Sequence, residues 1–381
     1  MLSGHPLRLL PGLVGLAVLL NPAGSGEPSL RWKGRPYKLD ALPAELSPEV
    51  AEAARPLAVW AEKKGYRMEL TPEADCLLVL SRRSSSSAEH LAWIAATIKA
   101  FEGVLAPRVA EPPDAAGGPT PPERKRLEDF DLPPLTPEVE MPRLPHQIPI
   151  LLEARNSKDY ESALGALVES CPWLGEWAEA RGKGAYGLVL PRPLLGAWLA
   201  DAPANEEWDP RNELVNRLAQ LIVIERAGVQ PYWLLAGLAW EIELSVRGGI
   251  FCFPYRSGFV GVEEHGGWAA RLSTLFAERA ERPPTAGEIA GLKRGVYVDD
   301  QAAVAWGAAR WLMKEQRAAL PPLLADLDQV RRKQGIEVRQ DGSWTTIPDW
   351  DWPDEVLDEI LRRHLGPDAF ERLGQAFRAG L

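Results

Sequence analysis

The stretch from residue 209 to residue 247 reads DPRNELVNRLAQLIVIERAGVQPYWLLAGLAWEIELSVR and decides the fold. It predicts two consecutive helices joined by a short break. Asp209 is a favourable N-cap for the first helix, and Pro210 suits its first turn, where a backbone N–H has no helical partner. Gly228 can end that helix in a left-handed conformation at the C′ position, and Pro231 can open the second one. The stretch therefore predicts a helical hairpin.

Three polar residues in the first helix have the spacing of a metal-binding helix. Asn212 and Asn216 are four residues apart, so they lie one turn from each other on the same face, with Glu213 beside the first. Two imidazoles at such positions bind zinc in one class of hydrolase, and the adjacent glutamate activates the metal-bound water. Here asparagine holds both outer positions. The spacing therefore indicates what the helix resembles more clearly than what it does.

Length, charge and cysteine content set the outer limits. The chain has 381 residues, of which 46% are hydrophobic and 25% charged, which is typical of globular protein and long enough for two domains. Its 43 basic and 53 acidic residues argue against a nucleic-acid partner. Cys76, Cys171 and Cys252 match neither a disulfide framework nor a CxxC metal motif. We expect buried free thiols, with one bridge in an oxidising compartment as the alternative.

The N-terminal residues 1–25 have the pattern of an export signal. An apolar run over residues 9–20 follows Arg8, and Ala23 and Ser25 are small residues suited to cleavage. The run is shorter than the roughly 20 apolar residues that a membrane-spanning helix needs. We therefore expect an exported protein, periplasmic or extracellular, with no membrane span in the mature chain. The alternative is an uncleaved N-terminal helix that tethers the protein to a membrane.

Composition divides the rest of the chain into two predicted modules and a linker. Residues 31–105 combine two amphipathic helices with an alternating strand at 66–70 and a short apolar strand at 76–80, which predicts a small α/β module without visible chemistry. Residues 106–147 are rich in proline, so we expect an extended linker there. Residues 148–381 are then the main domain.

Further elements are predicted along the main domain. Thr285 and Glu288 form a capping box ahead of a short helix, and residues 250–268 alternate strand and turn signals. The remaining predictions are strands at 148–153 and 186–190, helices at 159–168, 300–315, 321–333, 353–364 and 367–378, and a hairpin at 336–347 that turns at Asp341 and Gly342.

The helix pair resembles that of the gluzincin metallopeptidases, and of their peptidase-MA-like group in particular. That group has H-E-x-x-H in one helix and P-x-W-L-x-E-G-x-A at the next, where the glutamate before the glycine is the third zinc ligand. Here the matching segments read NELVN and PYWLLAGLA. The resemblance implies that Glu213 stands at the general base, that Asn212 and Asn216 replace both histidines, and that Ala236 replaces the third ligand.

This resemblance covers residues 148–381 and extends to the helix predicted at 300–315 and to the C-terminal segment. The chain is similar in this respect to exported proteins of planctomycete type. The resemblance implies an α+β fold. In that fold a gluzincin-like, thermolysin-like domain of a small sheet plus a helical bundle follows the small α/β module.

The loss of all three ligand positions decides the expected chemistry. Zinc in proteins is held by thiolate, imidazole or carboxylate donors, whereas a neutral amide is a poor donor and alanine offers none. We therefore expect neither zinc nor another cofactor. Glu213 is then a vestigial general base without a metal-bound water to activate.

Four other residues are candidates for a role beside the former active site. His265 could pair with Glu213 as an acid–base couple, although a structural histidine is the simpler interpretation. Trp233 and Trp240 are seven residues apart on one helix and are candidates to line the substrate cleft, together with Arg256. Most of the 15 tryptophans are expected in the core.

These observations favour an exported, non-catalytic relative of the zinc metallopeptidases that binds a peptide or a cell-envelope component in the old cleft. One alternative is an active hydrolase that uses Glu213 with His265 or another set of groups without zinc. Another is a structural or assembly protein whose tryptophan-rich surface meets a partner. The sequence does not indicate an oligomeric state.

Overall fold

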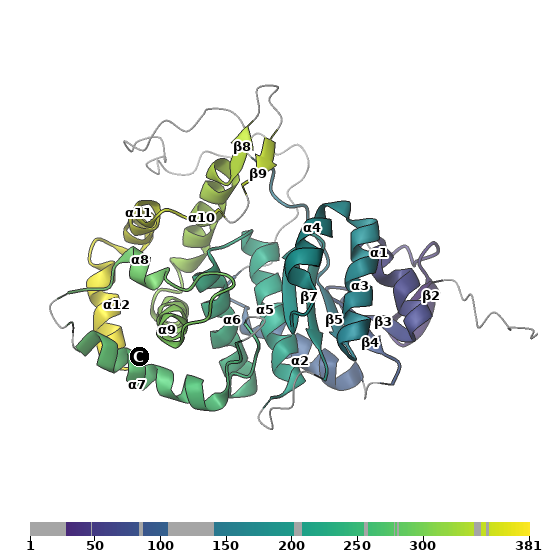
Figure 1. Ribbon diagram of the computed structural model, residues 1–381, viewed down its shortest axis with the longest axis horizontal. Helices are drawn as coiled ribbons and strands as arrows, with labels where there is room; N and C mark the ends of the chain where they lie inside the picture. Colours follow the sequence, from purple (N-terminus) through teal and green to yellow (C-terminus); the bar gives the residue numbers. More distant parts are fainter. Residues whose placement is uncertain are drawn as a thin grey trace, which may run out of the picture.

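The protein has two halves, one built on a β-sheet and one built from helices, and a helical hairpin joins them (Figure 1). The hairpin consists of α5 (Pro210–Ala227) and α6 (Tyr232–Arg247). The predicted export signal and most of the predicted linker lie outside the described residues. The computed structural model describes residues 28–46, 48–83, 87–105, 141–201, 208–254, 258–277, 279, 282–338, 344–347 and 350–381.

Seven of the described strands form one mixed sheet. Three neighbouring pairs of strands run parallel, and the other three pairs are antiparallel. The order across the sheet is β2 (Arg35–Lys38), β1 (Ser29–Trp32), β3 (Tyr66–Leu70), β4 (Leu77–Ser81), β5 (Ile150–Ala154), β7 (Leu194–Leu199) and β6 (Gly187–Pro191).

The pairing of β4 with β5 places strands of the two predicted modules in one sheet. Leu77 pairs with Ile150 in parallel, so residues 31–105 and 148–381 contribute to one larger sheet. The apolar run of β4 is buried on both faces, as an inner strand of such a sheet requires. No strand is predicted at β1, β2 or β7. The β7 sequence LLGAWL is apolar throughout and lacks the alternation that marks a half-exposed strand.

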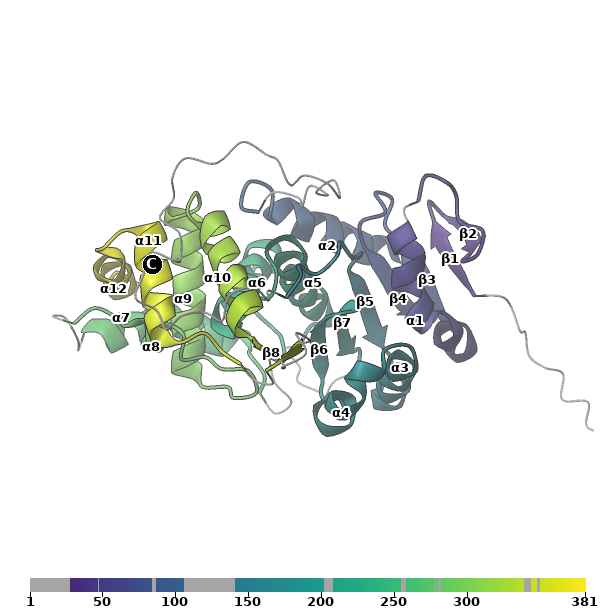
Figure 2. The same cartoon turned by 90° about the horizontal axis from the view of Figure 1, so that it is seen from above.

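Helices cover both faces of the sheet (Figure 2). On one face lie α1 (Pro48–Lys64) and α3 (Ser157–Ser170), and on the other lie α2 (Ser87–Ala100) and α5. Successive residues of β4 alternate between the two cores: Val79 packs with the first pair of helices and Leu78 with the second. The sheet is therefore the middle layer of three.

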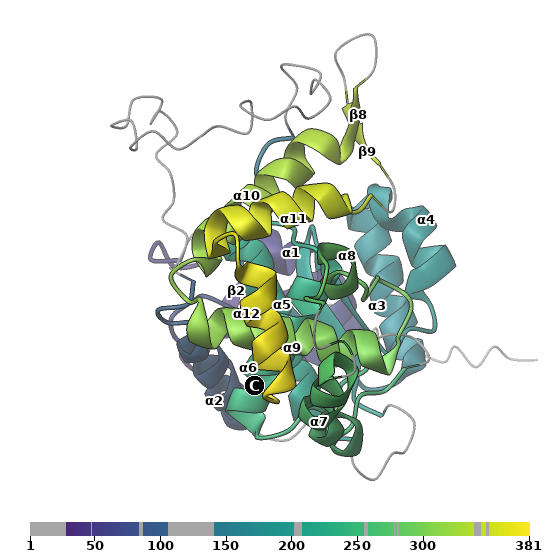
Figure 3. The same cartoon turned by 90° about the vertical axis from the view of Figure 1, so that its left-hand side faces the viewer.

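The helical half, which faces the viewer in Figure 3, is organised around α6. This helix packs against α5 and α9 and lies between them (Figure 2). A very short α4 (Gly175–Trp177) follows α3 at the sheet. The other helices and strands are α7 (Val262–Ala277), α8 (Ala286–Ile289), α9 (Asp299–Glu315), α10 (Leu320–Gln334), β8 (Ile336–Val338), β9 (Trp344–Thr346), α11 (Asp354–Leu365) and α12 (Ala369–Arg378).

The predicted end signals of the hairpin are confirmed. The side chain of Asp209 accepts a hydrogen bond from the backbone N of Arg211 at 2.9 Å, and Pro210 is the first residue of α5. Gly228 ends the helix with φ 77°, and Pro231 immediately precedes α6. These residues fix a tight turn, which decides which positions of the two helices face each other.

Two further predictions are confirmed and one is wrong in part. Thr285 and Glu288 form the capping box of α8, and β8 pairs antiparallel with β9, although the predicted turn at Asp341 and Gly342 lies outside the described residues. Before Val262 the strand signal predicted for residues 250–268 is confirmed, because Cys252 and Val260 form an isolated antiparallel bridge. From Val262 onward the prediction is wrong, because that residue begins α7. The helical spacing of its buried residues continues beyond that window, and two glycines near its start obscured it.

The three cysteines are free and buried, as predicted. Burial raises the pKa of the Cys76 and Cys252 thiols well above the ordinary value. These thiols are therefore packing groups in the described structure rather than reactive ones.

Gly237 sets the distance between α6 and α9. A Cβ at this position would collide with the carbonyl oxygen of Ala305 on α9. We predict that Gly237→Ala lowers the free energy of unfolding by about 1–3 kcal/mol, because overpacking forces two buried helices apart. Urea titration monitored by circular dichroism measures the change.

The matched control is Gly165→Ala in α3, an exposed helical position where an added Cβ has no neighbour within 4 Å. Alanine there is expected to raise the stability by about 0.5–1 kcal/mol, since it restricts the unfolded chain and favours helix. A Gly237→Ala protein as stable as the wild type would contradict the close approach of α6 and α9.

Candidate functional site

Helix α5 is buried along most of its length although it carries several polar residues. All residues from 212 to 224 are buried, because the helix packs against β6 and β7, α2 and α6. A polar group in such a place needs a hydrogen-bond partner. The polar residues concerned are Asn212, Glu213, Asn216, Arg217 and Gln220.

Glu243 of α6 lies between the two asparagines. Its Oε1 accepts a hydrogen bond from Asn212 Nδ2 at 2.8 Å, and its Oε2 accepts one from Asn216 Nδ2 at 2.9 Å. Oε1 also accepts a hydrogen bond from the backbone N of Phe251 at 2.6 Å. The side chain is fully buried. One carboxyl group therefore joins α5, α6 and the segment that follows α6.

The oxygens of the two asparagine amides are also occupied. Asn212 Oδ1 accepts a hydrogen bond from Arg247 Nε at 3.1 Å, and Asn216 Oδ1 accepts one from Gln220 Nε2 at 2.8 Å. Each amide thus presents its NH₂ group to Glu243, and an amide NH₂ has no lone pair to offer a metal. The residues present do not fit a zinc ion between the asparagines and Glu243.

Ala236, which aligns with the third zinc ligand, does not take part in this cluster. It precedes Glu243 by seven residues, so it lies about 10 Å away along α6. The acidic residue opposite the asparagines is Glu243 instead. The tight turn explains why Glu243 and not Ala236 lies opposite the asparagines. In a helical hairpin, residues equally far from the turn face each other, and Asn216 and Glu243 are such a pair.

Glu213 forms a buried ion pair with Arg217, one turn later on α5. Its Oε2 lies 2.7 Å from Arg217 Nη2, and the two side chains are 1% and 4% exposed. Its Oε1 accepts a hydrogen bond from the backbone N of Phe253 at 2.5 Å, and Arg217 donates to the Phe253 carbonyl at 2.6 Å. Burial raises the pKa of Glu213, and Arg217 opposes that shift. A carboxylate enclosed in this way cannot reach a substrate.

Two strand glycines make room for Arg217. A Cβ at Gly187 of β6 would lie 2.7 Å from Arg217 Nη2, and one at Gly196 of β7 would lie 2.8 Å from Arg217 Cβ. Both distances are shorter than real contacts allow. The arginine therefore lies flat between α5 and the sheet, and the glycines are part of the same buried arrangement.

His265 does not meet Glu213. Its ring packs edge-on against Trp268 and Trp306, with centroid distances of 5.3 Å to each. Burial and, to a smaller extent, the charge of Arg310 together lower the pKa of His265 to about 4, so the ring is neutral at neutral pH. Within the described part of the chain no hydrogen bond or ion pair links His265 to Glu213. The two residues do not form an acid–base couple.

The tryptophans predicted to line a cleft belong to the core. Trp233 and Trp240 are 2% and 1% exposed, and Trp240 Nε1 contacts Cys252 Sγ at 3.1 Å. The cleft prediction for them is wrong, because aromatic residues spaced along an apolar helix serve equally to fill the space between helices. Arg256, the third predicted cleft residue, lies outside the described residues.

The motif site is therefore closed. Across the described residues, no group of three or more His, Cys, Asp and Glu side chains is placed to hold a metal ion. The buried polar groups of α5 hold one another and the neighbouring backbone. This arrangement can stabilise and align the helix pair, but it offers no surface to a substrate.

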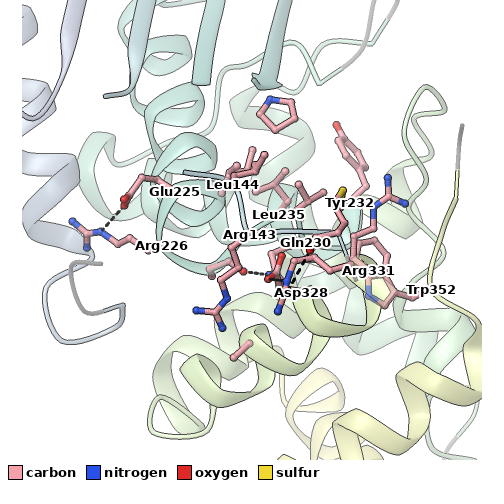
Figure 4. Close-up of a pocket in the computed structure, with 18 of the residues that line it drawn as sticks. Arg143, Leu144, Glu225, Arg226, Gln230, Tyr232, Leu235, Asp328, Arg331 and Trp352 are labelled. Atoms are coloured by element: carbon pink, nitrogen blue, oxygen red, sulfur yellow. Dashed lines mark hydrogen bonds and ion pairs between the residues drawn. The ribbon is translucent and has the colours of Figure 1, made fainter. Parts of the chain in front are cut away.

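An open pocket lies at the other end of the hairpin, around its turn (Figure 4). Its volume is about 930 Å³, which is at the upper end of the range for small-molecule sites. The walls come from the C-terminal end of α5, the turn at 228–230, α10, and the segments 141–144, 293–294 and 350–352. It is an accessible concave feature next to the helix pair.

The lining of this pocket is positively charged, although the whole chain has a net charge of −10. Tyr232, Trp350 and Trp352 add aromatic surface, and Gln230 adds a buried amide. The charged side chains among the described lining residues are Arg143, Arg226, Lys293, Arg294, Arg331 and Arg332, with Glu225, Asp328 and Asp351.

No motif predicts this pocket, because its residues come from distant segments that only the fold brings together. The available signals are short and scattered: the pair Lys293-Arg294, the basic end of α10, and the aromatic sequence WDW at 350–352. Each is common on protein surfaces. Their convergence follows from where the hairpin turn meets α10.

A scan of the chain against protein-family models finds no match, and a search of curated proteins finds none either. The likeness to the gluzincin metallopeptidases therefore rests on the residues of the helix pair.

Glu243 gives the folding stability a pH dependence. Burial raises its pKa to about 8, against the hydrogen bonds from Phe251, Asn212 and Asn216, which lower it. An unfolded glutamate titrates near pH ~4.3, so between these values the folded protein keeps a proton that the unfolded chain has released. The stability that Glu243 contributes is therefore complete below about pH 4 and is lost as the pH rises towards 8.

We predict that Glu243→Gln removes this dependence. In urea titrations between about pH 5 and pH 8, the wild type should lose stability relative to the variant, by up to ~1.4 kcal/mol per pH unit. A difference between the two proteins that stays constant across this range would show that the buried carboxyl group does not titrate there.

The ion pair of Glu213 and Arg217 gives a second prediction. Arg217→Met leaves a buried carboxylate without its cation, and we expect a loss of about 3–5 kcal/mol of stability. The double variant Glu213→Gln with Arg217→Met removes the orphaned charge, so it should be more stable than Arg217→Met alone. Thermal unfolding of the two variants tests this order, and a double variant that is less stable would contradict the pairing.

Proposed function

We propose that the chain is an exported, non-catalytic protein that keeps a metallopeptidase-like helix pair as a structural core and binds its ligand elsewhere. The proposed binding site is the open pocket at the hairpin turn rather than the position of the former metal. A peptide or a cell-envelope component is the proposed source of the ligand.

The position of Glu243 carries this proposal. Its two oxygens accept hydrogen bonds from the NH₂ groups of Asn212 and Asn216, which stand where the histidines of a zinc site would be. A catalytic helix pair needs an open coordination position for water and substrate. Here a buried carboxyl group from the same hairpin fills that space.

The two alternative functions have less support. An active hydrolase based on Glu213 and His265 needs two groups within hydrogen-bond reach of each other and of a substrate. Here Glu213 is buried against Arg217, whereas His265 packs between two tryptophans. An assembly protein with a tryptophan-rich surface needs exposed tryptophans. Trp173 is the one tryptophan among the large hydrophobic side chains exposed in the described structure.

Export is proposed from the N-terminal sequence alone. In the part of the chain that is described, no helix combines the length and the apolar character that crossing a membrane requires.

Metal analysis combined with a peptidase assay tests the absence of catalysis. After incubation with zinc and dialysis, we expect well under one zinc per chain, because the amide and carboxyl groups of the cluster already satisfy one another. We expect no cleavage of a casein substrate above background. The comparison protein is Glu213→Gln, which keeps the size of the side chain.

Stoichiometric zinc in the wild type would overturn the proposal. So would cleavage that is lost in Glu213→Gln while the variant retains its circular dichroism spectrum. Equal background activity in both proteins is the expected result.

A further inference from the structure

The charges that line the pocket do not balance. Of the described lining residues, six are cationic and three are acidic. Each acid already has a cationic neighbour: Lys293 lies 2.5 Å from Asp351, Arg332 lies 2.9 Å from Asp328, and Arg226 lies 4.0 Å from Glu225. The pocket therefore has an excess of positive charge that its own acids do not neutralise.

Arg294 and Arg331 are the centre of this excess. Neither guanidinium forms an ion pair with an acid in the described part of the chain. Arg294 lies over the ring of Tyr232 at 5.5 Å, and Arg331 lies over the ring of Trp350 at 5.1 Å and donates to its carbonyl oxygen at 3.2 Å. Stacking on aromatic faces holds both groups in place without cancelling their charge.

The two guanidiniums also act on each other. The pKa of Arg331 is lowered first by burial and then by the charge of Arg294, with Asp351 opposing in part. Two cations that repel each other, one of them partly buried, are stabilised by an anion that contacts both. An arginine pair suits carboxylate and phosphate groups, since the planar guanidinium donates two parallel hydrogen bonds.

Gln230 supplies an independent observation. Its side chain is 3% exposed and lines the pocket (Figure 4). Its Nε2 donates to the carbonyl oxygens of Ala227 at 2.6 Å and Leu324 at 3.1 Å, which fixes the orientation of the amide. Its Oε1 is buried and has no hydrogen-bond partner among the described residues. A buried acceptor left unpaired is costly, so a donor from a ligand would stabilise it.

The rest of the lining is apolar enough to hold a ligand body. Leu144, Ile224 and Leu235 contribute aliphatic surface, and Trp352 contributes a ring. The ring of Trp352 is held in place, because its Nε1 donates to the Leu327 carbonyl at 2.9 Å. The volume of about 930 Å³ exceeds what an inorganic anion alone would fill.

We propose that this pocket binds a small amphipathic anion, with its phosphate or carboxylate group between Arg294 and Arg331 and its apolar part on Tyr232, Trp350 and Trp352. A hydrogen-bond donor of the ligand meets Gln230 Oε1. The proposal rests on the proposed function, because it names the class of ligand for the same pocket. A phosphorylated envelope component and the carboxylate end of a peptide share this chemistry.

Isothermal titration calorimetry tests the proposal with three probes, namely phenyl phosphate, benzoate and inorganic phosphate. Phenyl phosphate or benzoate is expected to bind, and to bind more tightly than inorganic phosphate, because of the aromatic lining. Arg294→Gln and Arg331→Gln should each weaken binding roughly tenfold or more, since each removes a charged hydrogen bond. Binding should also weaken as salt is added.

The matched control is Arg82→Gln. Arg82 forms an exposed ion pair with Glu62 at 2.6 Å beyond β4, on the sheet half of the protein. Its loss removes one positive charge from the chain without touching the pocket, so the affinity should not change. Circular dichroism confirms that each variant is folded. If Arg331→Gln does not fold, the Arg294→Gln variant is measured instead, because Arg294 is exposed and its replacement leaves the core intact.

The outcomes separate the possibilities. Tight binding of phenyl phosphate alone assigns a phosphate ester, and binding of benzoate alone assigns a carboxylate. If neither aromatic anion binds the folded wild type, if inorganic phosphate binds as tightly as they do, or if both pocket variants bind like Arg82→Gln, the proposal is overturned. Such a failure leaves the zinc and peptidase results untouched, so the absence of catalysis is judged separately.

Discussion

The rest of the structure depends on the hydrogen bonds that two asparagines of α5 donate to Glu243 of α6. A helix placed between a sheet and other helices must satisfy every polar group it buries, because water cannot reach them. Asn212 and Asn216 meet that requirement through one carboxyl group. The contact fixes how α5 and α6 face each other and ties down the backbone at Phe251. The sheet then packs on one side of the pair and α9 on the other.

The two ends of the hairpin have different properties. The end that carries the metal-motif positions is enclosed. Glu213 there is paired with Arg217, and Glu243 accepts hydrogen bonds from the two asparagine amides. The end at the turn is open. Its Arg294 and Arg331 have no acidic ion-pair partner among the described residues, and Gln230 has an unpaired amide oxygen there. The two regions are separated by most of the length of α5, which is roughly 27 Å for its 18 residues. A chain with this arrangement can keep a rigid helix pair for stability while a ligand binds at the turn.

Local signals predicted much of this fold. Asp209, Gly228 and Pro231 mark the hairpin because caps and breakers act within a few residues, and the capping box at Thr285 works in the same way. Strand pairing between β4 and β5 escaped prediction, because it joins segments about 70 residues apart in sequence and leaves no local trace. At the site, the sequence predicted that the ligand positions are lost. It did not predict that Glu243 lies between the two asparagines, since that depends on which turns of the two helices face each other. The cleft prediction for Trp240 is wrong because aromatic residues on one helix face have the same sequence spacing whether they are buried or line a cleft.

The central claim is that a hydrogen-bonded Asn–Glu–Asn cluster occupies the place of a metal site. A crystal structure of the wild type grown with zinc, with anomalous data collected at the zinc absorption edge, tests it most directly. The account predicts no anomalous peak between Asn212, Asn216 and Glu243, with both amide NH₂ groups within hydrogen-bond distance of the carboxyl oxygens. A peak at that position, with the amides turned so that their oxygens and Glu243 coordinate the ion, would contradict it.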